Sequence, residues 1–168
     1  MIKNNELIDQ IKSYNKFLNI ESLNKAYNFA LEAHQNQKRE EGVPYIIHPV
    51  AVAKILTELR LDSATITTGL LHDTIEDTYA TYEVIKTEFG VEVADLVNGV
   101  TKISVFENQA TSNSKAENFR KLILATSKDI RVLLVKVADR LHNMRTIDAI
   151  DKPEKKERIA KETMEIYA

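Results

Sequence analysis

Cysteine is absent from this chain of 168 residues, which excludes disulfides, thiolate metal sites and a cysteine nucleophile. Long apolar runs are absent as well: no stretch approaches the roughly 18 uninterrupted apolar residues that a transmembrane helix needs. Charged and amide side chains are mixed throughout the N-terminal segment MIKNNELIDQIKSYNKFLNI, which does not fit a secretory signal. We therefore expect a protein of the reducing cytoplasm with no membrane partner.

Glycine and proline are scarce, with 4 and 3 residues respectively. So few turn-forming residues suit a bundle of helices and do not suit a sandwich of many short strands. Hydrophobic residues make up 43% of the chain, which is enough for one sizeable core, while 168 residues are few for two domains. The sequence predicts a single all-α domain, a compact helical bundle over residues 1–168.

An excess of positive charge is also missing, because 23 Lys and Arg stand against 25 Asp and Glu and the net charge is −2. Such a balance creates no basic field that would attract nucleic acid. The basic cluster from Lys152 to Arg158 alternates with Glu154 and Glu157, a pattern typical of a solvated helix face. We therefore expect no nucleic-acid partner.

Apolar residues spaced by three and four predict a helix from about Leu23. Asn19 or Ser22 can cap its N-terminus, and the helix is expected to end before Gly42. A second helix is predicted at Pro49, because proline suits a first helical turn. The residues expected on the buried faces are Ala26, Tyr27, Ala30, Leu31 and His34 in the first helix and Val52, Ile55, Leu56 and Leu59 in the second.

The rest of the chain is also predicted to be mainly helical. Asp62 or Ser63 caps a third helix, which carries the segment GLLHDTIEDT. The run IRVLLVKVADRLHNM has the β-branched content of a buried strand, but its length and the lack of partner strands favour a helix. Residues 101–115 are polar, and we expect a mobile loop there. Further helices are predicted over Thr81–Phe89 and Val91–Asn98, ended by Gly90 and Gly99, and over Lys115–Ser127 and Pro153–Tyr167.

Two groups of polar side chains follow apolar runs that indicate burial. On a continuous helix the first group spans an arc of about 140° and the second an arc of about 100°. Buried carboxylates without a cation cost several kcal/mol each, so two such arcs in one small domain predict a divalent metal. A mixed imidazole and carboxylate set suits manganese, iron or zinc better than calcium. The first group is His72, Asp73, Glu76 and Asp77, and the second is Asp139, His142, Asn143 and Thr146.

Three ordered motifs resemble those of a known family. The motifs PYIIHP, LLHDTIEDT and KVADRLHNMRT resemble the hydrolase domain of the RelA/SpoT family, which belongs to the HD-domain metal phosphohydrolases. The resemblance runs from about Leu23 to the last residue. The flanking segments that share it are KREEGVPYIIHP, FGVEVADLVNGVTKIS, AENFRKLILATSKDIRVLLVKVADRLHNMRT and ERIAKETMEIYA.

The resemblance implies an enzyme of the stringent response that hydrolyses ppGpp or pppGpp at the 3′-diphosphate, releasing pyrophosphate and GDP or GTP. It implies manganese as the cofactor, with four ligands: His48, His72, Asp73 and Asp139. It also implies that Glu76 and Asp77 act in catalysis, that Arg39 packs on the guanine, and that Asn143 and Thr146 lie near the nucleotide. Physically, a carboxylate one helical turn from a ligand can accept a proton from a water that a metal has acidified.

Some features of the sequence differ from the long members of that family. Glu40 follows Arg39 where many relatives carry a second basic residue, which affects the expected substrate affinity and the choice between ppGpp and pppGpp. The Glu76–Asp77 pair is present, whereas members that only synthesise the alarmone lack it, so hydrolysis is favoured. No synthetase domain follows ETMEIYA. We expect a free-standing hydrolase or a fragment of a longer protein, and the ending inside a familiar motif favours the fragment.

Alternative explanations exist for the function and for single residues. The chain could be another HD phosphohydrolase, acting on dNTPs or cyclic nucleotides, or a catalytically weak binding module. His34 is expected to be a packed core histidine, and His142 a hydrogen-bond partner beside the metal site. Arg39 lies in the mixed run KREE, where a solvated loop charge is the alternative. Among the aromatic residues, Tyr45 stays open because it is close in sequence to His48, and a core position is expected for Tyr27 and Phe89.

Overall fold

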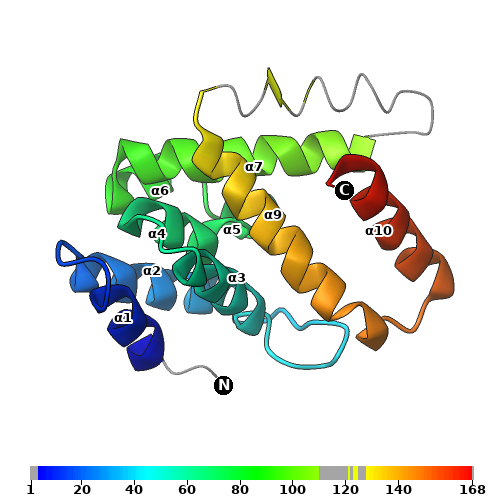
Figure 1. The fold of residues 1–168 in the computed structure, drawn as a ribbon, viewed down its shortest axis with the longest axis horizontal. Helices are drawn as coiled ribbons and strands as arrows, with labels where there is room; N and C mark the ends of the chain where they lie inside the picture. Colours follow the sequence, from blue (N-terminus) through cyan, green and yellow to red (C-terminus); the bar gives the residue numbers. More distant parts are fainter. Residues whose placement is uncertain (1–3, 110–120, 122, 125–127, 168) are drawn as a thin grey trace.

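A computed structural model describes residues 4–109, 121, 123, 124 and 128–167. The described residues form helices and turns, with one isolated bridge between Lys38 and Pro44 and no strand. The all-α prediction is therefore confirmed (Figure 1). The helices are α1 (Asn4–Lys12), α2 (Ile20–Ala33), α3 (Ile47–Glu58), α4 (Ser63–Leu71), α5 (Thr74–Asp77), α6 (Tyr82–Phe89), α7 (Val91–Gln109), α9 (Ile130–Arg145), the 3₁₀ helix η1 (Ile147–Ala149) and α10 (Pro153–Ile166).

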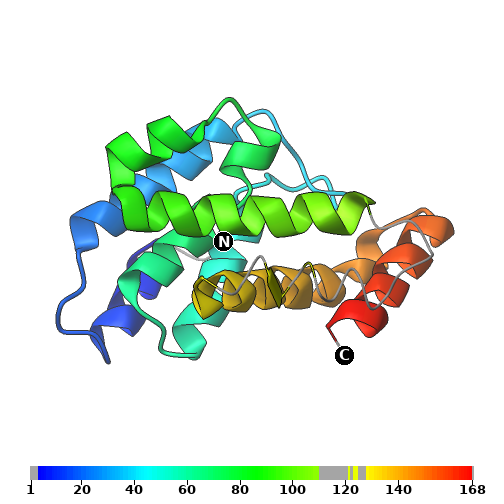
Figure 2. The ribbon, with the colours of Figure 1, turned by 90° about the horizontal axis from the view of Figure 1, so that it is seen from above.

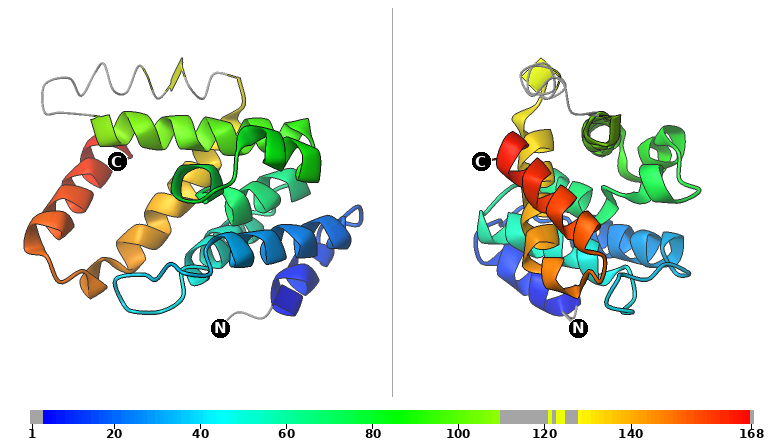
Figure 3. Two further views of the ribbon diagram at one scale, coloured as in Figure 1. Left: turned by 180° about the vertical axis from the view of Figure 1, so that it is seen from behind. Right: turned by 90° about the vertical axis from the view of Figure 1, so that its right-hand side faces the viewer.

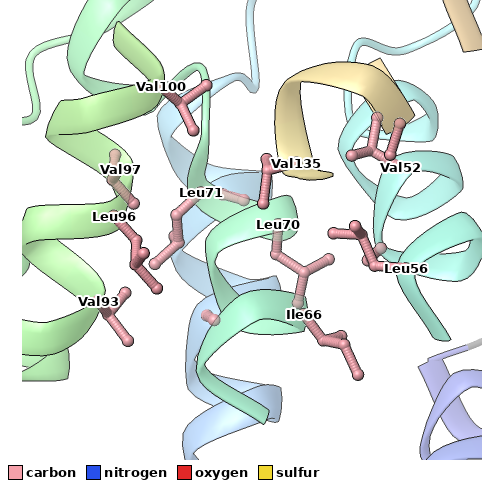
Figure 4. Packing of buried hydrophobic residues seen from close by; sticks show 14 of the residues in the cluster. Val52, Leu56, Ile66, Leu70, Leu71, Val93, Leu96, Val97, Val100 and Val135 are labelled. Atoms are coloured by element: carbon pink, nitrogen blue, oxygen red, sulfur yellow. The ribbon is translucent and has the colours of Figure 1, made fainter. Parts of the chain in front are cut away.

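Helix α4 lies in the middle of the bundle and packs against α2, α3, α7 and α9. Its sequence SATITTGLL contains no charged residue, so it can be surrounded by other helices on all sides. In Figure 4, Ile66 and Leu70 of α4 lie on the side of Leu56 of α3, while Leu71 lies on the side of α7. The α7 residues labelled there are Val93, Leu96, Val97 and Val100, all buried.

Helices α7 and α9 are the two longest elements and pack against each other as well as against α4. In the view of Figure 2, α9 is the helix drawn lower in the picture than α7. Helix α9 is formed by the run IRVLLVKVADRLHNM, so the helical alternative is confirmed. Its buried residues include the apolar Val132 and Val135 but also the charged Lys136 and Asp139. The charged part of α9 therefore contributes to the interior, where it needs partners.

The predictions for α7 are partly wrong. Gly99 does not end the helix, and residues 101–109 continue it instead of forming a mobile loop. The reason is that Val100 and Ile103 extend the apolar face of α7, with exposed fractions of 1% and 0%. The rest of the expected loop, residues 110–115, lies outside the described residues, as does most of the predicted helix before Ser127.

Several of the predicted helix ends are confirmed, although Asp62 stands at the N-cap of α4 without a side-chain cap hydrogen bond and α3 begins at Ile47, two residues before Pro49. Asn19 is the N-cap of α2, where its Oδ1 accepts a hydrogen bond from the backbone N–H of Ser22 at 3.0 Å. Thr81 caps α6 in the same way, and Gly90 follows the helix with a φ of 90°. Such a positive φ favours glycine, so the predicted stop is confirmed. The predicted helix at Pro153 is confirmed as α10.

Helix α1 is an element that no pattern above predicts. Its residues Leu7, Ile8 and Ile11 are buried, and the helix packs against α2 and α3. Two of the residues expected on buried faces are exposed, Leu31 at 42% and Leu59 at 57%. Leu59 is exposed because α3 ends at Glu58 and the chain turns away there.

Helices α1 and α10 lie at opposite ends of the molecule in the views of Figures 1 and 3. Helix α10 packs against α9. None of the helices formed by the described residues is both long and apolar enough to span a bilayer.

Candidate active site

The chain breaks its helix where the ionisable residues of GLLHDTIEDT begin. Helix α4 ends at Leu71, and the single turn α5 starts at Thr74. Nδ1 of His72 donates to the carbonyl of Gly69 at 2.8 Å, and Oγ1 of Thr74 donates to the carbonyl of Leu71 at 2.7 Å. These side chains satisfy carbonyls that the end of α4 leaves without helical partners. The prediction of one continuous helix with all four ionisable residues on one face is therefore wrong.

Three of the four predicted metal ligands form a buried group, with one ligand atom from each lying within 4.8 Å of the others: His48, His72 and Asp139. They come from the first turn of α3, the end of α4 and the middle of α9, which the packing of these helices brings together. Nε2 of His48 lies 3.1 Å from Oδ1 of Asp139, and Nε2 of His72 lies 3.9 Å from the same oxygen.

Asp73 lies beside this group. Its Oδ2 is 3.0 Å from Nε2 of His72 and 3.5 Å from Nε2 of His48. Burial opposes a charge on His72, but the carboxylates of Asp73 and Asp139 outweigh it and raise the pKa of His72 to about 9. The cluster therefore draws positive charge to the space between the two carboxylates. We refer to His48, His72, Asp73 and Asp139 as the His/Asp cluster.

The donor atoms of the cluster fit a divalent metal. Because Nδ1 of His72 donates to a carbonyl, Nε2 is the ring atom that can bind a metal once its proton is displaced, and it is buried 3.0 Å from Oδ2 of Asp73. Two imidazoles and two carboxylates are a set that manganese, iron and zinc accept. The four side chains of the cluster therefore already supply suitable donor atoms for such an ion.

His142 orients His48. The two Nδ1 atoms lie 2.7 Å apart. Burial, together with His48 and Arg39, lowers the pKa of His142 to about 4, so its ring is neutral and can accept a hydrogen bond. With a proton held on Nδ1 of His48 by this contact, Nε2, which lies 3.1 Å from Oδ1 of Asp139, would be the atom that can bind a metal. The expectation that His142 is a hydrogen-bond partner at the site is confirmed.

Lys136 is a buried cation that the sequence patterns did not single out. Its Nζ donates to Oδ2 of Asp139 at 2.8 Å and to Oγ of Ser104 at 2.9 Å, and lies 3.0 Å from Oε2 of Glu107. Burial opposes its charge, but Asp139 and Glu107 raise the pKa of Lys136 above its ordinary value. The lysine thereby occupies one oxygen of Asp139 and leaves Oδ1 directed at the histidines. Its spacing of three from Asp139 within an apolar run was the available signal.

Glu76 and Asp77 reach a pocket of about 180 Å³ that also contacts the His/Asp cluster. Both residues are exposed. Desolvation raises the pKa of Glu76 and of Asp77, and the charge of Asp73 adds to both shifts. The pocket is lined by Arg39, Tyr45, His48, Asp73, Glu76, Asp77, Ser104, Glu107, Lys136, Asp139 and Asn143.

Tyr45, left open by the sequence, belongs to the site. Its hydroxyl donates to Oδ2 of Asp73 at 2.6 Å. Burial, and then the charge of Asp73, raises the pKa of Tyr45, so the phenol keeps the proton that it donates. The ring also lies edge-on to His48, with centroids 5.8 Å apart. Tyr45 therefore holds both a carboxylate and an imidazole of the cluster.

The three predicted nucleotide contacts lie together. Nη2 of Arg39 donates to Oδ1 of Asn143 at 3.2 Å and to Oγ1 of Thr146 at 3.1 Å, so Arg39 is not a solvated loop charge. Nδ2 of Asn143 donates to Oδ1 of Asp139 at 2.8 Å, and this bond links the three residues to the His/Asp cluster. All three line a second pocket, of about 280 Å³, which shares Arg39, Tyr45 and Asn143 with the first. At its rim, Glu40 accepts a hydrogen bond from Lys155 of α10.

A helical bundle with a cluster of two histidines and two aspartates, of which His48, His72 and Asp139 are buried, defines the class of protein. The chain belongs to the HD-domain family, because a family model with the description HD domain matches residues 26–168.

Particular relatives share more than the class. The chain is 51% identical, over all of its 168 residues, to a protein of Brucella melitensis named GTP pyrophosphokinase rsh, of which it covers 22%. It is 53% identical over 149 residues, 89% of the chain, to the guanosine-3′,5′-bis(diphosphate) 3′-pyrophosphohydrolase of Vibrio cholerae, of which it covers 21%. The resemblance to the RelA/SpoT hydrolase domain is thus confirmed. The chain spans about a fifth of the length of these relatives.

A solved structure is similar in fold. It is described as a metazoan ortholog of SpoT that hydrolyses ppGpp and plays a role in starvation responses. The TM-score is 0.68 at 27% sequence identity, and the match covers 84% of this chain and 81% of that one.

Proposed function

We propose that this chain hydrolyses ppGpp or pppGpp at the 3′-diphosphate, with manganese as its metal, and thereby lowers the alarmone level during the stringent response. The observation that carries the proposal is that Glu76 and Asp77 line one pocket with the His/Asp cluster. The similarity to a 3′-pyrophosphohydrolase supports the same choice of substrate.

The His/Asp cluster is the proposed metal site, held by His48, His72, Asp73 and Asp139. A bound divalent ion would supply a Lewis acid for a phosphoryl oxygen and would make water more acidic. Lys136, His142 and Tyr45 orient the ligand atoms through hydrogen bonds, so the site is organised before the substrate binds.

In the proposed reaction, the oxygen of water forms a bond to the phosphorus next to the ribose, and the bond from this phosphorus to the 3′ oxygen breaks. Glu76 accepts a proton from the attacking water, and a proton passes to the departing 3′ oxygen, so GDP or GTP and pyrophosphate are formed. Burial raises the pKa of Glu76 above that of an ordinary carboxyl group, which makes the carboxylate a stronger proton acceptor. Asp77 lies in the same pocket and is proposed to act with it.

The nucleoside is proposed to occupy the second pocket. Arg39 presents a planar guanidinium that can stack on the guanine, and its bonds to Asn143 and Thr146 fix its position. Glu40, paired with Lys155, places a carboxylate at the rim where many relatives carry a basic residue.

The proposal is tested by offering the purified chain, with manganese, a panel of ppGpp, pppGpp, a deoxynucleoside triphosphate and a cyclic nucleotide. Pyrophosphate release from ppGpp, lost on chelation of the metal, supports the proposal. Turnover of only the other nucleotides would identify a different HD phosphohydrolase. Binding of ppGpp without turnover would identify a binding module.

A further inference from the structure

Gln37 connects the loop after α2 to the single turn α5. Its Nε2 donates to the main-chain carbonyl of Asp77 at 3.0 Å, and its Oε1 lies against Nδ1 of His34. Because the first bond requires the amide nitrogen on the side of Asp77, the oxygen faces His34, and Nδ1 of His34 therefore donates to it. Two directed hydrogen bonds thus run from His34 through Gln37 to Asp77.

The same imidazole also supports the other side of the pocket. The ring of His34 stacks on the ring of Tyr45, with centroids 4.6 Å apart and an interplanar angle of 29°. Tyr45 in turn donates to Asp73. One side chain, only 2% exposed, therefore contacts the supports of both Asp73 and Asp77.

A core packing role alone does not explain His34. Its Nε2 is buried and has no hydrogen-bond partner among the described residues, which is a cost that an apolar side chain of similar size would avoid. The polar edge that does have a partner, Nδ1, is the one directed at Gln37. The directed contact is therefore the feature that an apolar residue would not reproduce.

Helix α5 needs such support. It consists of one turn, and a single turn is not stable by itself. Its last carbonyls lack helical partners, and the carbonyl of Asp77 finds its partner in Gln37. A shift of this turn would move Glu76 and Asp77 relative to the His/Asp cluster.

We propose that His34 and Gln37 are positioning residues that hold Glu76 and Asp77 in place for the reaction. The inference rests on the proposed function, and it adds two residues that the resemblance did not assign. Neither residue lines the pocket next to the His/Asp cluster, so both act through the main chain of Asp77 and the ring of Tyr45.

The test compares variants of the 168-residue chain in pyrophosphate release from ppGpp with manganese. Gln37→Met keeps the length of the side chain and removes both hydrogen bonds. We expect kcat to fall by about tenfold to a hundredfold, the range for a small misplacement of reacting groups, with KM and bound manganese unchanged. Gln37→Glu keeps only the acceptor for His34 and is expected to lose kcat as well, because the donor to Asp77 is gone.

His34 is tested by two replacements that separate the stack from the hydrogen bond. His34→Phe keeps a ring against Tyr45 but loses the hydrogen bond to Gln37, and kcat is expected to fall. His34→Asn places an amide N–H near Nδ1 and should lose less kcat, because it keeps that hydrogen bond and loses only the stack on Tyr45. The double variant Gln37→Met/His34→Phe should be no slower than the slower single variant, because both single changes remove the same hydrogen bond between His34 and Gln37. Gln35→Met, at an exposed position two residues before Gln37, is the matched control and should behave as wild type.

The results separate the inference from the proposed function. An active wild type with Gln37→Met within twofold of it overturns the positioning role alone. If Gln37→Met loses both its bound manganese and its activity, the positioning role is also overturned, because Gln37 would then support the structure of the site as a whole. No pyrophosphate release from the wild type overturns the proposed function, and the inference with it.

Discussion

The two carboxylate oxygens of Asp139 have different neighbours. Oδ2 accepts from the buried Lys136, while Oδ1 faces His48 and accepts from Asn143. Lys136 has all three of its N–H groups near acceptors, so it cannot move without leaving a buried charge unpaired. At the scale of residues, the site is a set of groups whose orientation is determined by their partners.

Glu76→Gln tests the division of roles among these groups. The change preserves size and removes the carboxylate that accepts a proton, and general bases contribute about 100-fold to 10,000-fold. Pyrophosphate release from ppGpp should therefore fall at least about 100-fold, with KM and manganese content little changed. Glu83→Gln, on an exposed residue of α6, is the control. Activity of Glu76→Gln within about tenfold of wild type would mean that Glu76 is not the proton acceptor.

Arg39→Ala tests the nucleotide pocket. A stacked guanidinium stabilises the bound substrate and the transition state about equally, because it is remote from the bond that breaks. Steady-state kinetics should therefore show a rise in KM that is larger than any fall in kcat. Arg60→Ala, an exposed arginine after the end of α3, should change neither. A loss confined to kcat would assign Arg39 to the chemistry instead.

At the scale of elements, α7 and α9 approach closely where Gly99 faces Val132. A Cβ at residue 99 would lie 2.8 Å from Cγ2 and 3.1 Å from Cγ1 of Val132. Valine is stiff about χ1 in a helix, so its methyl groups cannot turn away easily. The glycine therefore permits the close packing that places Ser104 and Glu107 of α7 next to Lys136 of α9.

Gly99→Ala should for this reason destabilise the protein, although alanine is the better helix former. The gain in helix propensity is about 1 kcal/mol, and the cost of overpacking is about 1 to 3 kcal/mol. Urea unfolding should show a net loss of about 1 kcal/mol. Gly99→Ala combined with Val132→Ala should lose less than the sum of the two single changes, because the clash is removed. A Gly99→Ala protein more stable than wild type would show that the helices are not in tight contact there.

The sequence predicted most helices and their caps, because apolar spacing and capping chemistry are local properties. Two errors have a common cause in tertiary structure. Gly99 looks like a helix stop in the sequence, and only the neighbouring Val132 explains it as a packing position. The break at His72 and Asp73 is stabilised by side-chain bonds to the end of α4, which a helical arc drawn on the sequence does not contain.

At the scale of the whole molecule, the His/Asp cluster joins α3, the α4–α5 junction and α9. The motifs identified its members because each lies in a recognisable short segment. The supporting residues were harder to predict: Lys136 lies in an apolar run, and Gln37 acts through a main-chain carbonyl. These roles depend on contacts between segments that are distant in the sequence. No pattern within either segment alone predicts such contacts.

Manganese should stabilise the folded chain, because an ion that binds only the native state adds RT ln(1 + [L]/Kd), about 2.7 kcal/mol at one hundred times Kd. The melting temperature of wild type should rise with added manganese, and Asp139→Ala should abolish both this rise and the retention of metal. Asp148→Ala, at an exposed aspartate of η1, should keep the rise. An unchanged metal content in Asp139→Ala would remove Asp139 from the site.

The most direct measurement for the proposed function is the identity of the products formed from ppGpp by the wild-type chain with manganese, separated by anion-exchange chromatography. Cleavage between the 3′ oxygen and phosphorus predicts GDP and pyrophosphate in equal amounts, with no orthophosphate and with no reaction after chelation of the metal. Orthophosphate released stepwise, a nucleotide shortened at its 5′ end, or intact ppGpp beside a manganese-loaded chain would contradict it.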